Sequence, residues 1–277
     1  MSHGSPTSAK FPDFSILPNR QTGKALPVSG LAKFACIMLV VFSAAFMQVP
    51  AIDLAVSNVF FAPDDGFALT GNEGLKALRS ASSALTVGIA SLAVLAIFVP
   101  AIFPRWSGMI RPSQGVFLLT TLTVGPGIIV NSVLKNHWGR ARPRDTLELG
   151  GDWPFTPAWA NVDHCSGNCS FVSGEASAVF WLVALACIAP KSWRLPVVAV
   201  ALMFAGAVSI GRLAVGAHYL SDVVIAWAIT LLVVAIGRWL LLDRHRAEAI
   251  DTALTGILQL KYRARAALPN KAGGDKA

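Results

Sequence analysis

The stretch Gly211-Arg-Leu-Ala-Val-Gly-Ala-His218-Tyr-Leu-Ser-Asp222 places ionisable side chains at the junction of two long apolar runs. Such groups are costly at a membrane border, so they indicate a functional site by default. His218 and Asp222 are four residues apart, and on a helix they would share one face. The carboxylate could then accept the Nδ1 hydrogen and leave Nε2 as a nucleophile or base. Because Arg212 adds a planar cation suited to phosphate, the stretch indicates phosphate chemistry between two membrane spans.

The composition predicts an integral membrane protein. Of 277 residues, 54% are hydrophobic and only 14% are charged, which is too apolar for an ordinary soluble domain of this length. The formal net charge is +8, a value that a nucleic-acid-binding protein could share. Here, however, the basic residues sit mainly in the tails and in short loops between apolar runs, as in membrane proteins. We therefore expect the membrane as a partner and no nucleic acid.

Apolar runs divide the chain into spans and tails. We expect an all-α polytopic protein with a cytoplasmic tail at 1–33, a six-helix domain at 34–242 and a basic cytoplasmic tail at 243–277. A cleaved signal peptide is the rival interpretation of the first run. The second tail is either a basic amphipathic surface helix or a solvated segment. The six predicted spans cover residues 34–52, 80–104, 112–134, 171–190, 195–211 and 219–242.

Charge between the runs predicts the topology. Asp53 to Glu73 carries four acidic residues and no Lys or Arg, as expected of an outside loop, whereas the loops around Arg105 and Lys191 are basic and should face the cytoplasm. With alternating directions, spans three to six place their polar ends on the outer side. Gly125-Pro126-Gly127, inside the third run, predicts a kink.

Three segments at these polar ends form the candidate site. In Lys135-Asn-His-Trp-Gly-Arg-Ala-Arg142-Pro143, two cations bracket a turn and could neutralise phosphoryl oxygens. In Phe171-Val-Ser173-Gly174-Glu175-Ala, a hydroxyl and a glycine begin a helix whose free N–H groups attract anions. The third segment is the stretch from Gly211 to Asp222. Taken singly, each feature has an ordinary structural explanation as a cap or a snorkelling cation. Their joint placement on one membrane face favours a site.

The order and spacing of the three segments closely resemble the signature of the type 2 phosphatidic acid phosphatase superfamily, which includes membrane lipid phosphatases and relatives of vanadium haloperoxidases. The resemblance covers about Lys135 to Asp222 and the six-helix layout. It implies that His218 attacks phosphorus to give a phosphohistidine and that Asp222 orients it. It also implies that no metal or other cofactor takes part. The residues that would hold the phosphate are Lys135, Arg142, Ser173, Gly174 and Arg212.

Two positions depart from the family pattern. Gly211 stands where a serine usually precedes the arginine, which removes one phosphate hydrogen bond. Glu175 stands where the family has the histidine that protonates the leaving alkoxide. Glu175 can act as this general acid only if its carboxyl is protonated, which burial or bound phosphate would favour. Otherwise His137 or His164 donates the proton, or the leaving group is acidic enough to need little help.

The segment Cys165-x3-Cys169-Ser-Phe-Val-Ser-Gly-Glu resembles family members of Gram-negative bacteria that dephosphorylate lipid A. We therefore expect a bacterial inner-membrane enzyme that removes a 1- or 4'-phosphate from lipid A on the periplasmic face. Undecaprenyl pyrophosphate, phosphatidylglycerophosphate and phosphatidate are alternative substrates. A lipid phosphotransferase or a non-catalytic phosphate-binding protein is the alternative of another class. An oxidising compartment permits a Cys165–Cys169 disulfide, and a metal pair with His164 is its rival.

Overall fold

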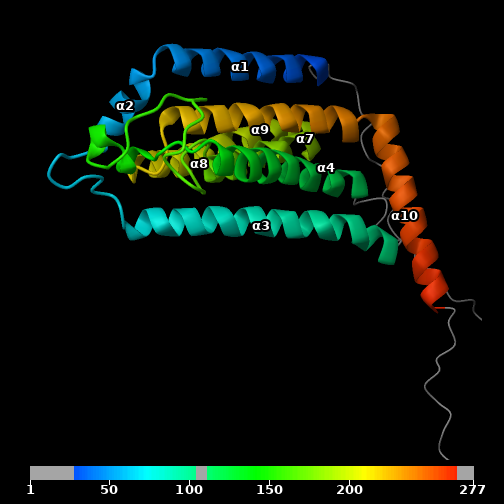
Figure 1. Cartoon of the computed structure of the whole chain (residues 1–277). Coiled ribbons are helices and arrows are strands. Elements are labelled where there is room, and N and C mark those ends of the chain that lie inside the picture. Colours follow the sequence, from blue (N-terminus) through cyan, green and yellow to red (C-terminus); the bar gives the residue numbers. More distant parts are fainter. Residues whose placement is uncertain (1–27, 104–110, 267–277) are drawn as a thin grey trace, which may run out of the picture.

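The computed structural model describes residues 28–103 and 111–266, which form an all-α bundle (Figure 1). Its long helices are α1 (Val28–Gln48), α3 (Glu73–Ile102), α8 (Arg194–Ala214), α9 (Leu220–Leu241) and α10 (Arg244–Ala266). Another long helical stretch joins α4 (Pro112–Leu122), the π-helical η2 (Thr123–Leu134) and α5 (Lys135–His137). The short elements are α2 (Ala51–Asn58), η3 (Pro143–Asp145), η4 (Leu147–Leu149), α6 (Gly174–Phe180), η5 (Trp181–Ala184), α7 (Leu185–Ile188) and η6 (Lys191–Trp193).

The bundle is that of a multi-pass membrane protein. Within the described ranges, 5 helices are long and apolar enough to cross a membrane, namely Gly30–Gln48, Glu73–Pro100, Pro112–His137, Lys191–Ala214 and Leu220–Leu241. The expected fourth span is shorter than predicted, because its helix covers only Gly174–Ile188. At 1.5 Å per residue it is roughly 22 Å long, less than the ~30 Å of hydrocarbon.

Helix α9 lies at the centre of the bundle. It packs against α1, α4 and α6, and its inward side chains, such as Ile225 and Val234, are buried. By contrast, α1 and α3 expose large apolar side chains, including Val40 and Val87. Such apolar surface is what a helix facing lipid requires, because the bilayer core offers no polar partners. The outer helices are therefore the lipid-facing layer around α9.

Helix α3 begins at Glu73, well before the predicted start of its apolar run at residue 80. Asn72 caps it, because its Oδ1 accepts the N–H of Leu75 at 3.1 Å. An ion pair of 2.9 Å between Glu73 and Lys76 supports the same first turn. Apolar periodicity could not reveal these polar turns. Their consequence is functional, since they carry Arg79 to the candidate site.

The predicted kink at Gly125-Pro126-Gly127 is a π-helical stretch, η2. Pro126 has no N–H to donate, and its carbonyl accepts the side-chain amide of Asn131 at 2.6 Å. Asn131 in turn packs against Gly174, where any Cβ would collide with its side chain. The π-helical stretch η2 therefore packs, through Asn131, against the start of α6, where Gly174 leaves room for the Asn131 side chain.

The two ends of the bundle differ. Figure 1 shows α2 and the loop between α5 and α6 at one end, while α10 lies across the other end, near the start of α1. Helix α10 packs on α3 and α4, and the N–H of Ser113 donates to Asp251 at 2.7 Å. The part of the second tail from 244 to 266 is thus a docked helix. Most of the first tail, Arg105 and residues 267–277 lie outside the described residues.

Candidate active site

Main-chain hydrogen bonds tie the three predicted segments together at one end of the bundle. The N–H of Cys169 donates to the carbonyl of Lys135 at 3.0 Å, and the N–H of Ser170 donates to that of Arg140 at 2.9 Å. The N–H of Ser173 donates to the carbonyl of Asp222, in the first turn of α9, at 3.1 Å. The loop that precedes α6 is therefore held between the other two segments.

His218 is almost fully buried, with 1% of its surface exposed. Its Nδ1 lies 2.8 Å from the carbonyl of Ser170. A carbonyl can only accept, so Nδ1 carries the hydrogen and the lone pair is on Nε2. The expected direct bond to Asp222 is not formed, because the nearest carboxylate oxygen lies 3.8 Å from Nδ1. The imidazole is thus oriented by a backbone carbonyl, with Asp222 as its neighbouring charge.

The oxygens of Asp222 already have other donors. Its Oδ2 accepts the Ser170 hydroxyl at 2.6 Å and the Tyr219 N–H at 2.9 Å. Its Oδ1 accepts an Nη1 hydrogen of Arg140 at 2.7 Å. Ser170 therefore links the two catalytic candidates, since its hydroxyl binds Asp222 and its carbonyl binds His218.

A buried charge network lies behind Asp222. Arg140, with no exposed surface, pairs with Asp222 and also with Asp53 of α2, whose Oδ2 is 2.8 Å from its Nη2. Asp53 accepts two further hydrogen bonds from Ser221, one from its N–H at 2.8 Å and one from its hydroxyl at 2.5 Å. The Arg140 guanidinium also lies 4.1 Å from the ring centre of Tyr219. Every charge in this network is paired, as burial requires.

Burial lowers the pKa of His218 below its ordinary value of 6.5, although the neighbouring Asp222 carboxylate acts in the opposite direction. The positive charges of Lys135 and Arg142 lower the pKa further. The imidazole is therefore neutral at physiological pH. A neutral imidazole with its lone pair on Nε2 is a nucleophile.

Glu175 lies between two arginines. Its Oε1 is 2.8 Å from Nε of Arg79, and its Oε2 is 2.8 Å from Nε of Arg212. Lys135 and Arg142 are close enough for electrostatic interaction with the same carboxylate. Four cations therefore surround one acidic side chain. This excess of positive charge suits a phosphate dianion.

Ser173 and Gly174 lie at the start of α6, as predicted. The Ser173 hydroxyl accepts the N–H of Ala176 at 3.3 Å and so caps the helix. Both residues are buried beside Asp222. His137 and His164 are the histidines considered above as proton donors. His137 is exposed, and its Nδ1 donates to the carbonyl of Val133 at 2.9 Å.

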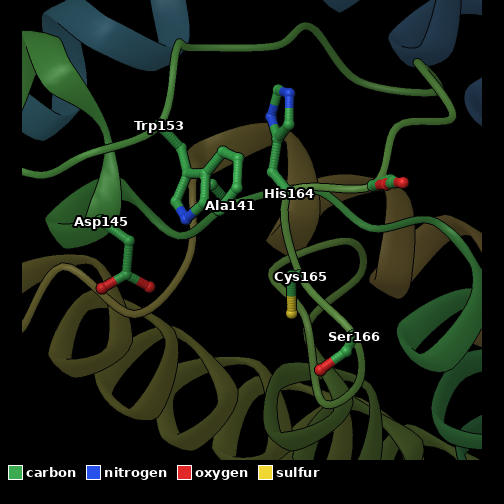
Figure 2. Close-up of a pocket in the computed structure, with 7 residues that line it drawn as sticks. Ala141, Asp145, Trp153, His164, Cys165 and Ser166 are labelled. Carbon is green, nitrogen blue, oxygen red and sulfur yellow. The ribbon is translucent and has the colours of Figure 1, made fainter.

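A pocket of about 410 Å³ lies along the segment that carries Arg142. Figure 2 shows Asp145 and Trp153 lining it from one segment and His164 and Cys165 from another. The rings of Trp153 and His164 stack with their centres 5.1 Å apart. Its other lining residues are Ala141, Asp163 and Ser166. The volume is in the range of small-molecule sites.

Cys165 and Cys169 are joined by a disulfide, with their Cα atoms 5.7 Å apart. Disulfide sulfurs are not thiolate ligands, so the rival metal pair with His164 has lost its sulfur donors. Among the described residues, no cluster of three His, Cys, Asp or Glu side chains has the arrangement of a metal site.

Sequence reasoning missed three charged residues of this site, namely Arg79, Arg140 and Asp53. Arg140 lies inside the Lys135–Arg142 segment, where other basic residues surround it and nothing in the sequence marks it as buried. Asp53 was interpreted only as the start of an outside loop. Arg79 lies 96 positions before Glu175, its partner, and no local pattern connects the two.

Part of the chain is similar in sequence to known proteins. Residues 114–246 match the PAP2 superfamily. The chain is 47% identical over 117 residues to a lipid A 4'-phosphatase of Rhizobium leguminosarum, which is 42% of this chain and 50% of that protein. It is 39% identical over 109 residues to a lipid A 4'-phosphatase of Francisella tularensis subsp. novicida, 39% of this chain and 49% of that protein. The alignments span about half the length of these relatives.

A solved structure has the same fold. The crystal structure of a transmembrane PAP2-type phosphatidylglycerolphosphate phosphatase from Bacillus subtilis superposes with a TM-score of 0.51. The match covers 75% of this chain and 94% of that chain, at 19% sequence identity. Residues 114–246, which carry the three site segments, therefore match the PAP2 superfamily, and the bundle has the fold of a solved PAP2-type phosphatase.

Proposed function

We propose that the protein is a lipid phosphatase that hydrolyses the 4'-phosphate ester of lipid A on the periplasmic face of the bacterial inner membrane. The observation that carries this proposal is His218, buried, with its Nδ1 fixed by Ser170, beside a cluster of four cations. The names of the relatives, lipid A 4'-phosphatases, support the substrate.

The proposed reaction has two steps at one phosphorus atom. Nε2 of His218 attacks phosphorus, the P–N bond forms, and the P–O bond to the sugar breaks; the sugar oxygen takes a proton from solvent and leaves as the alcohol. Water then attacks the phosphohistidine, the P–N bond breaks to restore Nε2, and the phosphate and solvent keep the protons of that water. Positive charge on the imidazole develops in the first step, and Asp222, 3.8 Å from Nδ1, stabilises it.

The cations hold the phosphoryl oxygens in this scheme. Lys135 and Arg142 provide positive charge from one segment and Arg212 from another, and the start of α6 at Gly174 adds a backbone N–H group. Phosphoryl transfer needs chiefly positioning and charge neutralisation, both of which such a cluster supplies.

The pocket beside Arg142 favours a sugar phosphate. An exposed aromatic ring, Trp153, offers a face for a sugar ring, while Asp145 and Asp163 can accept hydrogen bonds from hydroxyl groups. Two carboxylates also repel a second anionic group. Phosphatidate and prenyl pyrophosphate offer no hydroxylated ring for this pocket, whereas the lipid A backbone does.

Trp153→Ala should therefore lower kcat/KM for lipid A by about 10-fold, the usual effect of losing roughly one stacking contact. Turnover of phosphatidate should be unchanged, because it has no sugar ring to stack. Phosphate release is measured on both lipids in mixed micelles. An equal loss on both lipids would remove the pocket from substrate recognition.

Six crossings complete the proposed topology, with Gly174–Ile188 as a short, protein-lined crossing. Its side chains Val179, Trp181 and Leu182 are buried in the bundle, so it needs little contact with lipid. The proposed outer face is the end that carries α2 and the disulfide loop.

Alkaline phosphatase, which is active in the periplasm, and a fluorescent reporter, which is active in the cytoplasm, are each placed after Asp145 and after Ala277. Alkaline phosphatase should be active after Asp145, and the fluorescent reporter should be active after Ala277. Finding both positions on one side of the membrane would contradict six crossings.

The substrate is tested by phosphate release from purified protein in detergent. Lipid A carrying a 4'-phosphate is compared with lipid A carrying only a 1-phosphate, and with phosphatidylglycerophosphate and undecaprenyl pyrophosphate. The proposal predicts the highest kcat/KM on the first substrate. Phosphate that appears only on an added lipid acceptor, and not in water, would make the protein a phosphotransferase.

A further inference from the structure

The buried network around Arg140 connects the candidate nucleophile to a helix outside the family match. Asp53 belongs to α2, whereas the match covers residues 114–246. Asp53 has 0% exposed surface, and its two oxygens accept hydrogen bonds from Arg140 and Ser221. A carboxylate that is buried this completely persists only with full pairing. It requires an explanation beyond the phosphate-binding cluster, which it does not touch.

We propose that Asp53 is a positioning residue for His218, acting through Arg140 and Asp222; this inference rests on the proposed role of His218 as nucleophile. The path is continuous. Asp53 binds one arm of the Arg140 guanidinium at 2.8 Å, and the other arm binds Asp222 at 2.7 Å. Asp222 accepts the Ser170 hydroxyl at 2.6 Å, and the Ser170 carbonyl accepts Nδ1 of His218 at 2.8 Å.

The charge balance gives Asp53 a chemical effect as well as a geometric one. Two carboxylates share one guanidinium, so the network carries one net negative charge. That charge is available to the imidazole when its Nε2 bonds to phosphorus and the ring becomes positive. Without Asp53, Arg140 and Asp222 neutralise each other, and the ring loses this support.

The bridge also fixes a direction. A guanidinium offers its donors in a rigid plane, so its two arms cannot bind Asp53 and Asp222 in arbitrary orientations. Ser221 reinforces this arrangement, because its hydroxyl donates to Asp53 and accepts from Arg140 at 2.8 Å. Helix α2 therefore braces the start of α9, the helix that carries Asp222.

The environment of His218 determines the sign of the test. The charged groups that face it are Asp222 from α9, Lys135 from α5 and Arg142 from the following loop, with Arg140 behind Asp222. Removal of the negative charge of Asp53 leaves less negative charge near His218 to offset these cations. Protonation of His218 then becomes less favourable, and its titration moves to lower pH.

The experiment is an NMR titration of full-length protein in micelles, labelled with nitrogen-15 at histidine. The His218 signal is assigned by its loss in His218→Ala. Asp53→Asn should shift the His218 titration to lower pH and reduce kcat on the phosphate ester by up to about 100-fold, with KM unchanged because Asp53 does not touch substrate. If Asp53→Asn folds poorly, Ser221→Ala replaces it as a milder change. It should shift the His218 titration and lower kcat in the same direction, by smaller amounts.

The matched control is Thr230→Val, which removes a buried hydrogen bond of 2.7 Å to Ser177 two turns further along α9. It should lower the melting temperature and leave both the His218 titration and kcat unchanged. The positioning role would be overturned if Asp53→Asn and Ser221→Ala lowered the melting temperature but left the His218 titration and kcat unchanged. The titration needs no turnover, so absence of phosphate release by the wild-type protein would refute the proposed function separately.

Discussion

Replacing His218 with alanine should abolish phosphate release from lipid A, because no other group in the described structure combines burial, a fixed Nδ1 and a neighbouring cation cluster. The loss should reach the background of the uncatalysed reaction, since the covalent route disappears. The measurement is phosphate release by purified protein under single-turnover conditions. His245→Ala in α10, at the other end of the bundle, is the matched control and should retain full activity.

Asp222→Asn should also lower turnover strongly, by about 10²–10⁴-fold, because the charge next to the imidazole is lost. Unlike His218→Ala, it should reduce stability as well. The neutral amide would weaken the hydrogen bond to the buried Arg140, which keeps Asp53 as its carboxylate partner, so the cost should be about the 1.5–3 kcal/mol of one hydrogen bond to a charged group. Thermal unfolding in detergent separates the two effects. An active His218→Ala protein would contradict the nucleophile assignment whatever Asp222→Asn does.

Glu175→Gln should lower kcat/KM by the same factor, roughly 10-fold or more, on an alkyl phosphate and on an activated aryl phosphate. The reason is its position: both of its oxygens form ion pairs with arginines, so we expect Glu175 to orient Arg79 and Arg212. Loss of orientation affects both substrates alike. Arg79→Gln, which removes one partner of the same carboxylate, should reproduce the effect in a weaker form, since Arg79 is largely exposed.

A different result would revive the general-acid interpretation of Glu175. Only the alkyl substrate needs a proton on its leaving oxygen, so a loss confined to that substrate is the signature of a missing acid. In that outcome, Glu175→His should restore activity on alkyl phosphates. Unchanged activity of Glu175→Gln on both substrates would instead exclude Glu175 from the site.

The fold could be anticipated to the extent that it depends on hydrophobic runs. Five predicted spans correspond to long apolar helices, because hydrocarbon thickness imposes their length. The fourth, Gly174–Ile188, is shorter than its apolar run suggested, since the first residues of that run belong to the loop that follows Ser170. Polar first turns, such as that of α3 at Glu73, carry no apolar signal, and so the start of that helix was missed.

The candidate site was predictable where its spacing is local. His218 and Asp222 are four positions apart, and the structure places them near each other, at 3.8 Å. The partners that orient them are not local. Asp53 reaches Arg140 across 87 positions and Glu175 reaches Arg79 across 96, and one sequence shows no pattern over such distances. The prediction of a direct hydrogen bond between Asp222 and His218 was wrong, because Arg140 and Ser170 already donate hydrogen bonds to the Asp222 carboxylate. Both donors lie far from Asp222 in the sequence.

The central claim is that a phosphoryl group resides on Nε2 of His218 during turnover. Lipid A radiolabelled at its 4'-phosphate is mixed with the wild-type protein, quenched in alkali within the first turnover, and the labelled protein is digested and mapped. The account predicts alkali-stable, acid-labile label on the peptide that contains His218, and none in His218→Ala. Label on any other residue, or phosphate released through the first turnover while His218 stays unlabelled at every quench time, would contradict it.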